Sequence, residues 1–239
     1  MKIAFPGAGK VGGALADQLQ HLGHAVKIAA RDPASETVAA LLAQNPGIGA
    51  GAMAETVAWA DIVFVATPAA VAGEAVAAVA SAVQGKAIVD CTNPVGPGLT
   101  HGLDSRTSAS HGLQAAAPGA AVVKAFTIYG VEVLRDNRFP ASNTLPAMMY
   151  CGDDAAAKAR VAGLITELGW QPFDVAGLDQ AVHLKHMTLL WVWLVRANGH
   201  SPHLAWAALA RQTAAAGCWP IATGWAAQAR GSQVQRGEA

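Results

Sequence analysis

Charged residues are scarce in this chain of 239 residues, making up 13% of it, and the formal net charge is zero. Because neither sign is in excess, we expect no nucleic acid partner. The three cysteines, Cys91, Cys151 and Cys218, are too few and too scattered for a disulfide framework or a zinc site, so no metal is predicted. Unpaired thiols fit a reducing cytoplasm, and Cys91 and Cys151, inside apolar runs, are expected to be buried and inert.

Long hydrophobic runs are also missing. The apolar stretches at residues 57–65 and 188–195 fall short of the length that spans a bilayer. A strand pattern begins at residue 2, which leaves no room for a signal segment before it. We therefore expect a soluble cytoplasmic protein with no membrane partner. The length allows one sizeable core, or one domain with an appendage.

A glycine-rich turn near the start is the most informative feature that is present. Residues 2–6 form a short apolar run that leads into Gly7-x-Gly9-x-x-Gly12, and an amphipathic helix pattern follows. Gly7 permits a tight turn, Gly9 lets the backbone approach a pyrophosphate, and Gly12 lets the helix pack close to the strand. The helix start offers N–H groups and a positive dipole end to phosphates. This position between strand and helix predicts a dinucleotide site rather than a ligand-free turn.

The end of the second predicted strand, residues 25–30, bears on the choice of cofactor. Arg31 can stack on adenine and donate hydrogen bonds to a 2′-phosphate, with Ser35 as a second donor. Asp32 could instead bind the ribose of NAD, but Asp32-Pro33 is also typical of a helix N-cap followed by proline at the first helical position. We favour Asp32 as the cap, and therefore predict NADP(H) as the cofactor.

Strand and helix patterns alternate through the first 175 residues, which predicts an α/β fold with a doubly wound, Rossmann-type, mostly parallel sheet. Expected strands lie at residues 2–6, 25–30, 49–52, 61–66, 86–90, 122–126, 148–151 and 171–175, the last two extending the same sheet. Expected helices lie at 35–44, 55–60, 67–83 and 153–168, and a loop at 96–119 holds a helical turn at 108–116. Ligands bind such sheets at the carboxyl ends of strands.

From residue 178 onward the patterns are helical only. Residues 178–195 are apolar nearly all round, which predicts a buried helix, either central or at a subunit contact. Ser201-Pro202 predicts the start of another helix that runs to residue 210. Five of the seven tryptophans lie after position 190, and a homodimer would bury them. We predict an NADP-binding domain at 1–177 and a smaller helical domain at 178–239 that holds the substrate cleft and the dimer contact.

Several segments, taken in order, resemble the family of NADPH-dependent oxidoreductases related to the NADP:deazaflavin (coenzyme F-420) oxidoreductases. The matching segments are the glycine loop at 7–12, Arg31-Asp32, Ala66-Thr67-Pro68, residues 90–94, residues 123–126 with Tyr129-Gly130, residues 151–154 and residues 178–181. The resemblance covers about residues 1–210. It implies a Rossmann domain that binds NADP, a smaller C-terminal domain, and hydride transfer between the nicotinamide and a second ring system or a carbonyl-like acceptor.

The resemblance also implies roles for individual residues. Those implied to bind the cofactor are Gly7, Gly9, Lys10, Val11 and Gly12 at the pyrophosphate, Arg31 at the 2′-phosphate, and Thr67 and Pro68 along the ribose and nicotinamide. Asn93 and Pro94 would line the acceptor side. Ser35 stands where a basic residue is frequent in relatives. Further departures from the family pattern, at Thr127, Ala176-Gly177 and Lys185, fall towards the acceptor pocket.

The acceptor decides which catalytic groups are needed. Hydride transfer to a deazaflavin or flavin co-substrate needs little acid–base machinery; it needs the two rings stacked at near-attack distance in a site from which water is excluded. A ketone or imine acceptor also requires a proton donor, for which Tyr129, His183 and His186 are our catalytic candidates, with Lys185 also available. The histidines lie three apart on one helical face and could instead be packed side chains. Tyr129 could be a core tyrosine with a bonded hydroxyl.

Three functions are therefore compatible with the sequence. The leading one is an NADPH-dependent oxidoreductase that acts on a deazaflavin or similar small-molecule hydride acceptor. The second is an NADPH-dependent ketone or imine reductase. The third is a regulatory protein that senses NADP without turnover. This alternative stands because the sequence shows no clear acid–base pair.

Overall fold

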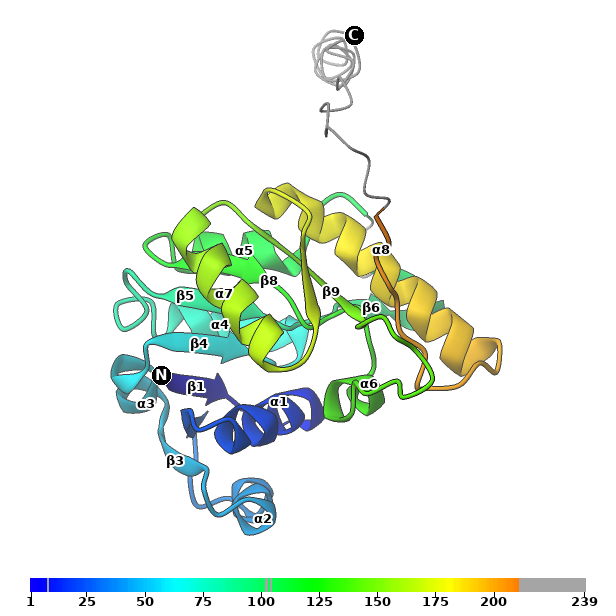
Figure 1. Ribbon diagram of the computed structural model, residues 1–239. Coiled ribbons are helices and arrows are strands. Elements are labelled where there is room, and N and C mark those ends of the chain that lie inside the picture. Colours follow the sequence, from blue (N-terminus) through cyan, green and yellow to red (C-terminus); the bar gives the residue numbers. More distant parts are fainter. Residues whose placement is uncertain (8, 102, 104, 211–239) are drawn as a thin grey trace, which may run out of the picture. The chain divides into compact units, whose positions relative to one another are not determined.

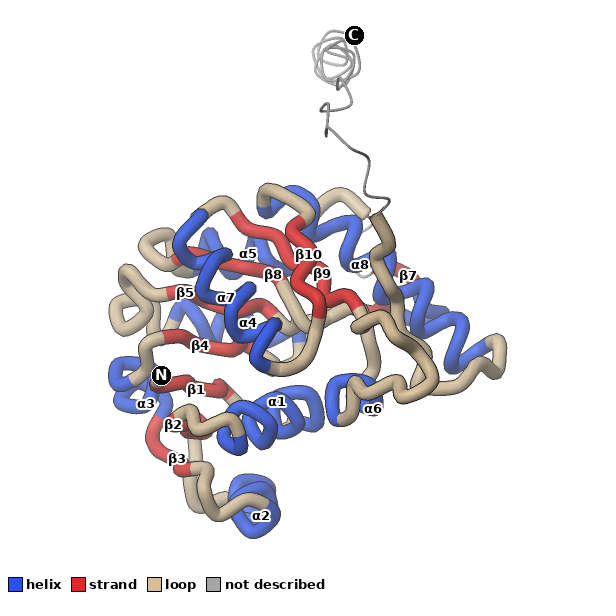
Figure 2. The backbone as a smooth tube through the Cα atoms, in the orientation of Figure 1, coloured by secondary structure: helices blue, strands red, loops and turns tan. Residues whose placement is uncertain are grey.

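An eight-stranded sheet organises the part of the chain described by the computed structural model, which is residues 1–210 except 8, 102 and 104. The strand order across the sheet is β10-β9-β8-β5-β4-β1-β2-β3 (Figures 1 and 2). The strands are β1 (Lys2–Pro6), β2 (Ala25–Ala30), β3 (Gly49–Ala52), β4 (Ile62–Val65), β5 (Ala87–Asp90), β8 (Ala121–Lys124), β9 (Ala147–Gly152) and β10 (Gln171–Asp174).

Strand direction confirms the predicted doubly wound, mostly parallel sheet. β1 pairs in parallel with β2 on one side and with β4 on the other, and β2–β3, β4–β5 and β5–β8 are also parallel. β9 runs antiparallel to β8, and β10 is parallel to β9, so these two strands extend the same sheet in the reverse direction. The carboxyl ends of β1, β4, β5 and β8 therefore meet at one edge, where the strand order switches at β1.

Helices cover both faces of the sheet, because successive strand side chains point to opposite sides. Ile3 and Phe5 join the core cluster with α1, α7 and α8, whereas Ala4 joins the cluster with α3, α4 and α5. The rings of Phe5, Phe64 and Phe126 follow one another across the first face, with centroids 5.0 and 5.8 Å apart. The helices are α1 (Lys10–His21), α2 (Glu36–Gln44), α3 (Met53–Trp59), α4 (Ala69–Ala77), α5 (Ala109–Ala116), α6 (Val131–Arg135), α7 (Ala155–Glu167) and α8 (Ala181–Val192). Figure 1 shows α7 in front of the strands and α4 and α5 behind them.

Two local features differ from the prediction. Asp32 does not cap α2, because the helix begins at Glu36 with Ser35 at the N-cap, while Asp32 Oδ1 accepts a bond from the Ala34 N–H at 3.0 Å and closes a turn. The loop at 96–119 holds α5 as expected, but it also holds a short antiparallel pair, β6 (Val95–Gly96) and β7 (Thr100–His101). The sequence gives no sign of this pair, since only two residues on each side form it.

The predicted helix at 201–210 is wrong. This segment carries no helix, and the backbone groups of Leu204 and Trp206 bond to distant parts of the chain. The Ala147 N–H at the start of β9 donates to the Trp206 carbonyl at 2.8 Å, and the Trp191 indole donates to the Leu204 carbonyl at 2.7 Å. These long-range bonds replace the local helical ones that Ser201-Pro202 suggested.

α8 packs on the same compact unit as the sheet, which extends to Ala208. A 3-10 turn at Leu178–Gln180 precedes α8, and a π-helical turn at Trp193–Ala197 ends it. A separate domain starting at residue 178 stays a prediction, and most of its expected C-terminal part, with Cys218, lies outside the described residues. Among the described residues, no helix is both long and apolar enough to cross a bilayer.

Candidate cofactor and acceptor site

The glycine loop lies at the switch point of the sheet, directly after β1. Gly7 takes a φ of +90°, a conformation that favours glycine, and its N–H donates to the Ala29 carbonyl at 3.0 Å. A Cβ at position 7 would lie 3.1 Å from Thr67 Cγ2, so the loop also packs closely against the end of β4. A Cβ at Gly12 would lie 3.3 Å from Ala66 Cβ, which explains the close packing of α1 on this edge. Gly7 and Gly12 therefore have the mechanical roles that the motif predicts.

The first turn of α1 presents N–H groups to this edge. Gly9 is the N-cap, and among the described residues no side chain caps the turn and no acidic residue stands in it. The dipole of the twelve-residue helix and its unpaired first-turn N–H groups, which include those of Lys10 and Val11, suit a phosphate. Beside them, Thr67 Oγ1 is buried with no hydrogen-bond partner in the described structure. These N–H groups and the Thr67 hydroxyl suit a dinucleotide pyrophosphate.

The end of β2 carries the second part of the predicted cofactor site. Arg31 follows β2 directly, is exposed, and shows no ion pair or hydrogen bond of its guanidinium to the described residues. Ser35 is the N-cap of α2, yet its hydroxyl does not cap the helix. Both side chains are thus available to a phosphate group. Pro68 lies at the end of β4, as the N-cap of α4, and is exposed.

Asn93, after β5, joins the strand ends to α8. Its amide nitrogen donates to the Thr127 carbonyl at 3.0 Å, and its amide oxygen accepts a bond from Thr188 Oγ1 at 3.2 Å. The Thr188 hydroxyl also lies 3.0 Å from the Thr127 carbonyl. Pro94 follows Asn93 and is half-buried. This face of α8 therefore lies against the carboxyl ends of β5 and β8, on the side predicted for the acceptor.

A buried ion pair lies next to these strand ends. Lys124 Nζ lies 3.2 Å from Asp90 Oδ2 and donates to the Thr92 carbonyl at 2.8 Å. The Ser110 hydroxyl and the Thr92 N–H also donate to the Asp90 carboxylate, at 2.6 and 2.8 Å. Each member of this pair therefore has hydrogen bonds beyond the one to its partner, as a buried ion pair requires.

Tyr129 is placed in the core rather than at the strand ends. Its hydroxyl donates to the Ala147 carbonyl at 2.5 Å and accepts a bond from the Trp206 N–H at 3.2 Å, and its ring stacks on Trp170 with centroids 5.1 Å apart. Burial raises the pKa of this phenol well above its ordinary value. The contacts favour the alternative of a core tyrosine with a bonded hydroxyl.

The histidines of α8 are on its exposed side. His183 and His186 are both exposed, and the His186 ring lies 5.0 Å from the His101 ring of β7, measured between centroids. The polar side chains of α8 that turn inward are instead Lys185 and Thr188, which are 1% and 3% exposed. Sequence reasoning favours the imidazoles for their chemistry. The sequence signal that could have indicated burial of Lys185 is its position in the helix, because it falls on the same face as the buried residues Leu184, Thr188 and Trp191.

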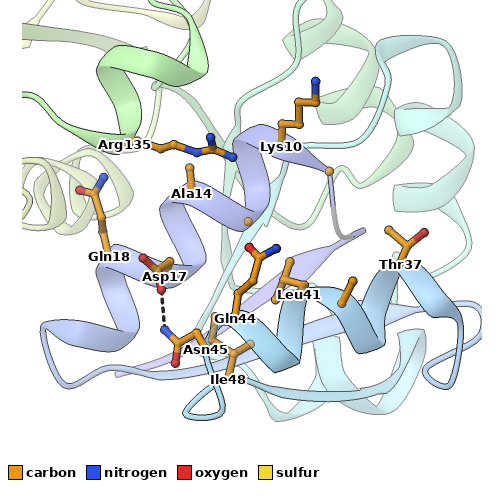
Figure 3. A pocket seen from close by; sticks show the side chains of 13 residues that line it. Lys10, Ala14, Asp17, Gln18, Thr37, Leu41, Gln44, Asn45, Ile48 and Arg135 are labelled. Atoms are coloured by element: carbon orange, nitrogen blue, oxygen red, sulfur yellow. Dashed lines mark hydrogen bonds between the residues drawn. The ribbon is translucent and has the colours of Figure 1, made fainter.

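A groove of about 630 Å³ adjoins the glycine loop but does not coincide with the strand ends (Figure 3). It lies between α1 and α2, with Lys10 at one end and Asp17, bonded to Asn45 at 2.7 Å, further along α1. Thr67, Pro68 and Asn93 do not line it. The groove therefore does not include the residues predicted for the ribose, the nicotinamide and the acceptor.

Comparison with known proteins agrees with this geometry. A family model described as "NADP oxidoreductase coenzyme F420-dependent" matches residues 2–94. The solved structure of a candidate F420-dependent NADP-reductase from Arthrobacter sp. FB24 is 31% identical in sequence, with a TM-score of 0.73, and the alignment covers 83% of this chain and 95% of that one. The chain belongs to this family. The resemblance inferred from the sequence motifs is thereby confirmed.

More distant structures share the fold. A hypothetical protein from Sinorhizobium meliloti is 25% identical with a TM-score of 0.65, over 76% of this chain and 88% of that one. A pyrroline carboxylate reductase from Plasmodium falciparum, solved with NADP bound, is 15% identical with a TM-score of 0.55, over 84% of this chain and 71% of that one. At that identity the likeness concerns the fold alone. A search of curated proteins gives no match.

Proposed function

We propose that this member of the F420-dependent NADP oxidoreductase family transfers a hydride between NADP(H) and a deazaflavin or a similar acceptor. The observation that carries the proposal is the uncapped start of α1 beside the unpartnered Thr67 hydroxyl, at the point where the strand order switches. A dinucleotide would satisfy both. Because the chain belongs to this family, and because the nicotinamide ring of a bound dinucleotide carries out redox chemistry, the proposed reaction is an oxidoreduction.

Each cofactor contact has a residue suited to it. The N–H groups at the start of α1, from Gly9 to Gly12, would hold the pyrophosphate, since Gly7 and Gly9 keep side chains out of its way. Arg31 would bind the 2′-phosphate, with the Ser35 hydroxyl as a second donor. Thr67 and Pro68 would lie along the ribose and nicotinamide. Bound there, the nicotinamide would supply the hydride, and the chain would hold it against an acceptor near Asn93 and Pro94.

A panel of candidate acceptors tests which compound takes the hydride. NADPH oxidation is followed at 340 nm with coenzyme F420, riboflavin, a quinone, a ketone and a cyclic imine in turn. The proposal expects turnover with F420 well above the rest. Turnover confined to the ketone or imine would replace it with the second function. Tight NADPH binding with no oxidation by any acceptor would favour the sensor.

We also propose that the protein is a homodimer. Leu190 and Trp193, in the second half of α8 and just after it, are both 49% exposed, although large apolar side chains are favoured at subunit contacts. Light scattering after gel filtration should give twice the chain mass. Trp193→Glu should shift this mass towards the monomer, and a monomeric wild type would refute the dimer.

A further inference from the structure

Lys185 is a buried lysine whose ammonium has no hydrogen-bond partner among the described residues. Its side chain is 1% exposed, and Nζ forms no hydrogen bond to the described residues. Two more buried polar atoms at the nearby strand ends, Thr92 Oγ1 and Thr127 Oγ1, also lack partners in the part of the chain that the structure describes. Buried polar groups are nearly always satisfied, so unsatisfied ones gathered in one place call for an explanation.

The position of Lys185 on α8 directs it to the acceptor side. Thr188 lies one turn later on the same helix face and bonds to Asn93 and to the Thr127 carbonyl. Lys185 is therefore held beside the ends of β5 and β8. Lys124 is near enough that its charge acts on the Lys185 ammonium.

No carboxylate described in this region is available to Lys185. Asp90 is fully buried and already accepts bonds from Lys124, from Ser110 and from the Thr92 N–H. A second ammonium near Lys124 is repelled rather than paired. A structural lysine would be expected to reach solvent or a carboxylate. Among the described residues Lys185 reaches neither, which fits a partner supplied by a ligand.

We propose that Lys185 is a catalytic residue that donates a proton to the hydride acceptor. This inference rests on the proposed function and specifies its substrate class: an acceptor with a carbonyl or a conjugated ring-amide group, whose oxygen or nitrogen becomes negative on reduction. The hydride leaves reduced nicotinamide dinucleotide with the electron pair of its C–H bond and forms a C–H bond on the acceptor. The displaced electron pair of the acceptor takes the proton of Lys185 Nζ. Water then reprotonates the neutral amine.

The environment of Lys185 makes this proton transferable near neutral pH. Burial, and secondarily the charge of Lys124, lower the pKa of Lys185 from 10.5 to about 8. The other titratable groups on the elements packed against α8 include His101 of β7, which lies against His186, Tyr150 and Cys151 of β9, Asp179 of the 3-10 turn and Arg196 of the π-helical turn; Asp90 is paired with Lys124. Burial raises the pKa of Cys151 to about 12, so that thiol is neutral. Activity that depends on protonated Lys185 should fall as the pH rises through about 8.

The test compares Lys185→Met with wild type, using Lys158→Met as the control. Lys158 lies on α7 and pairs with Asp174 at 3.0 Å. With F420 as the probe, Lys185→Met should lower kcat by about 100-fold or more at pH 7. It should leave the Kd for NADPH within about twofold and lose the fall of kcat above pH 8. Lys158→Met should match wild type in all three measurements.

A second readout does not depend on turnover. In protein labelled with [ε-¹³C]lysine, the NMR resonance lost in Lys185→Met should titrate near pH 8, and oxidised F420 with NADP⁺ should raise that midpoint. An active wild type matched by Lys185→Met, or a lysine that titrates near 10.5 with or without F420, would overturn this inference alone. A wild type that oxidises no NADPH with any acceptor would overturn the proposed function, and the inference with it.

Discussion

Lys185→Met is expected to stabilise the fold while it removes activity. An ammonium whose pKa is lowered from 10.5 to about 8 by the fold destabilises the folded state by roughly 3 kcal/mol at neutral pH. Methionine has a similar length and no charge, so it can fill the same space with little cavity cost. The free energy of unfolding at pH 7 should therefore rise by up to about 3 kcal/mol. Residual solvation of the ammonium would reduce this figure.

The stability difference between Lys185→Met and wild type should depend on pH. Between about pH 8 and 10.5 the unfolded chain still binds the Lys185 proton and the folded chain does not, so wild-type stability gains from that lysine as the pH rises. The advantage of Lys185→Met is complete below about pH 8 and is lost towards 10.5. Urea unfolding of both proteins at pH 7 and at pH 10 measures it.

Lys158→Met serves as the matched control in the same unfolding experiment. Its ion pair with Asp174 is partly exposed, so its loss should cost less than about 1 kcal/mol at pH 7. A Lys185→Met protein that is less stable than wild type at pH 7, or that gains the same stability at both pH values, would refute this prediction. Either result would mean that Lys185 is not an unpaired buried charge and that the fold does not lower its pKa.

Three further substitutions test other parts of the account. Arg31→Ala should weaken the binding of NADPH by about 1.5–3 kcal/mol and the binding of NADH by much less, as measured by calorimetry. Equal losses for the two nucleotides would assign NAD as the cofactor instead. Asp90→Ala leaves the Lys124 ammonium buried without its partner and should lower the free energy of unfolding by about 3–5 kcal/mol in urea. Tyr129→Phe removes the bond to the Ala147 carbonyl, so thermal unfolding should show a loss of about 1 kcal/mol while kcat stays unchanged; a drop in kcat of tenfold or more with intact folding would restore Tyr129 as a catalytic candidate.

The sheet could be predicted because its signals are local. The apolar runs, the glycines at 7, 9 and 12 and the alternation of strand and helix each depend on neighbouring residues. Family membership followed from motifs that lie at the strand ends. The segment at 201–210 failed for the opposite reason: Ser201-Pro202 carries a local helix signal, but Trp206 bonds with Ala147 and Tyr129, which are far away in the sequence.

The acceptor side was the least predictable part of the site. Imidazole titrates near neutral pH, so sequence reasoning favours His183 and His186 over a lysine with an ordinary pKa. The structure turns both histidines outward and buries Lys185, and it is this burial that brings the lysine pKa towards neutrality. An environment of that kind depends on the packing of α8 against β7 and β9, which no local pattern specifies.

Calorimetric titration of NADPH into wild type and Gly9→Ala tests the central claim most directly, because that claim is a pyrophosphate held at the start of α1. A Cβ at position 9 would lie 3.6 Å from the Ala66 carbonyl oxygen, an ordinary contact, so Gly9→Ala should fold with a loss of at most about 1 kcal/mol. The control is Gly73→Ala on α4, where a Cβ meets no described atom within 4 Å. We predict that Gly9→Ala raises the Kd at least about tenfold while Gly73→Ala leaves it unchanged. A wild type that binds no NADPH, or a Gly9→Ala protein that binds it equally well, would contradict the account.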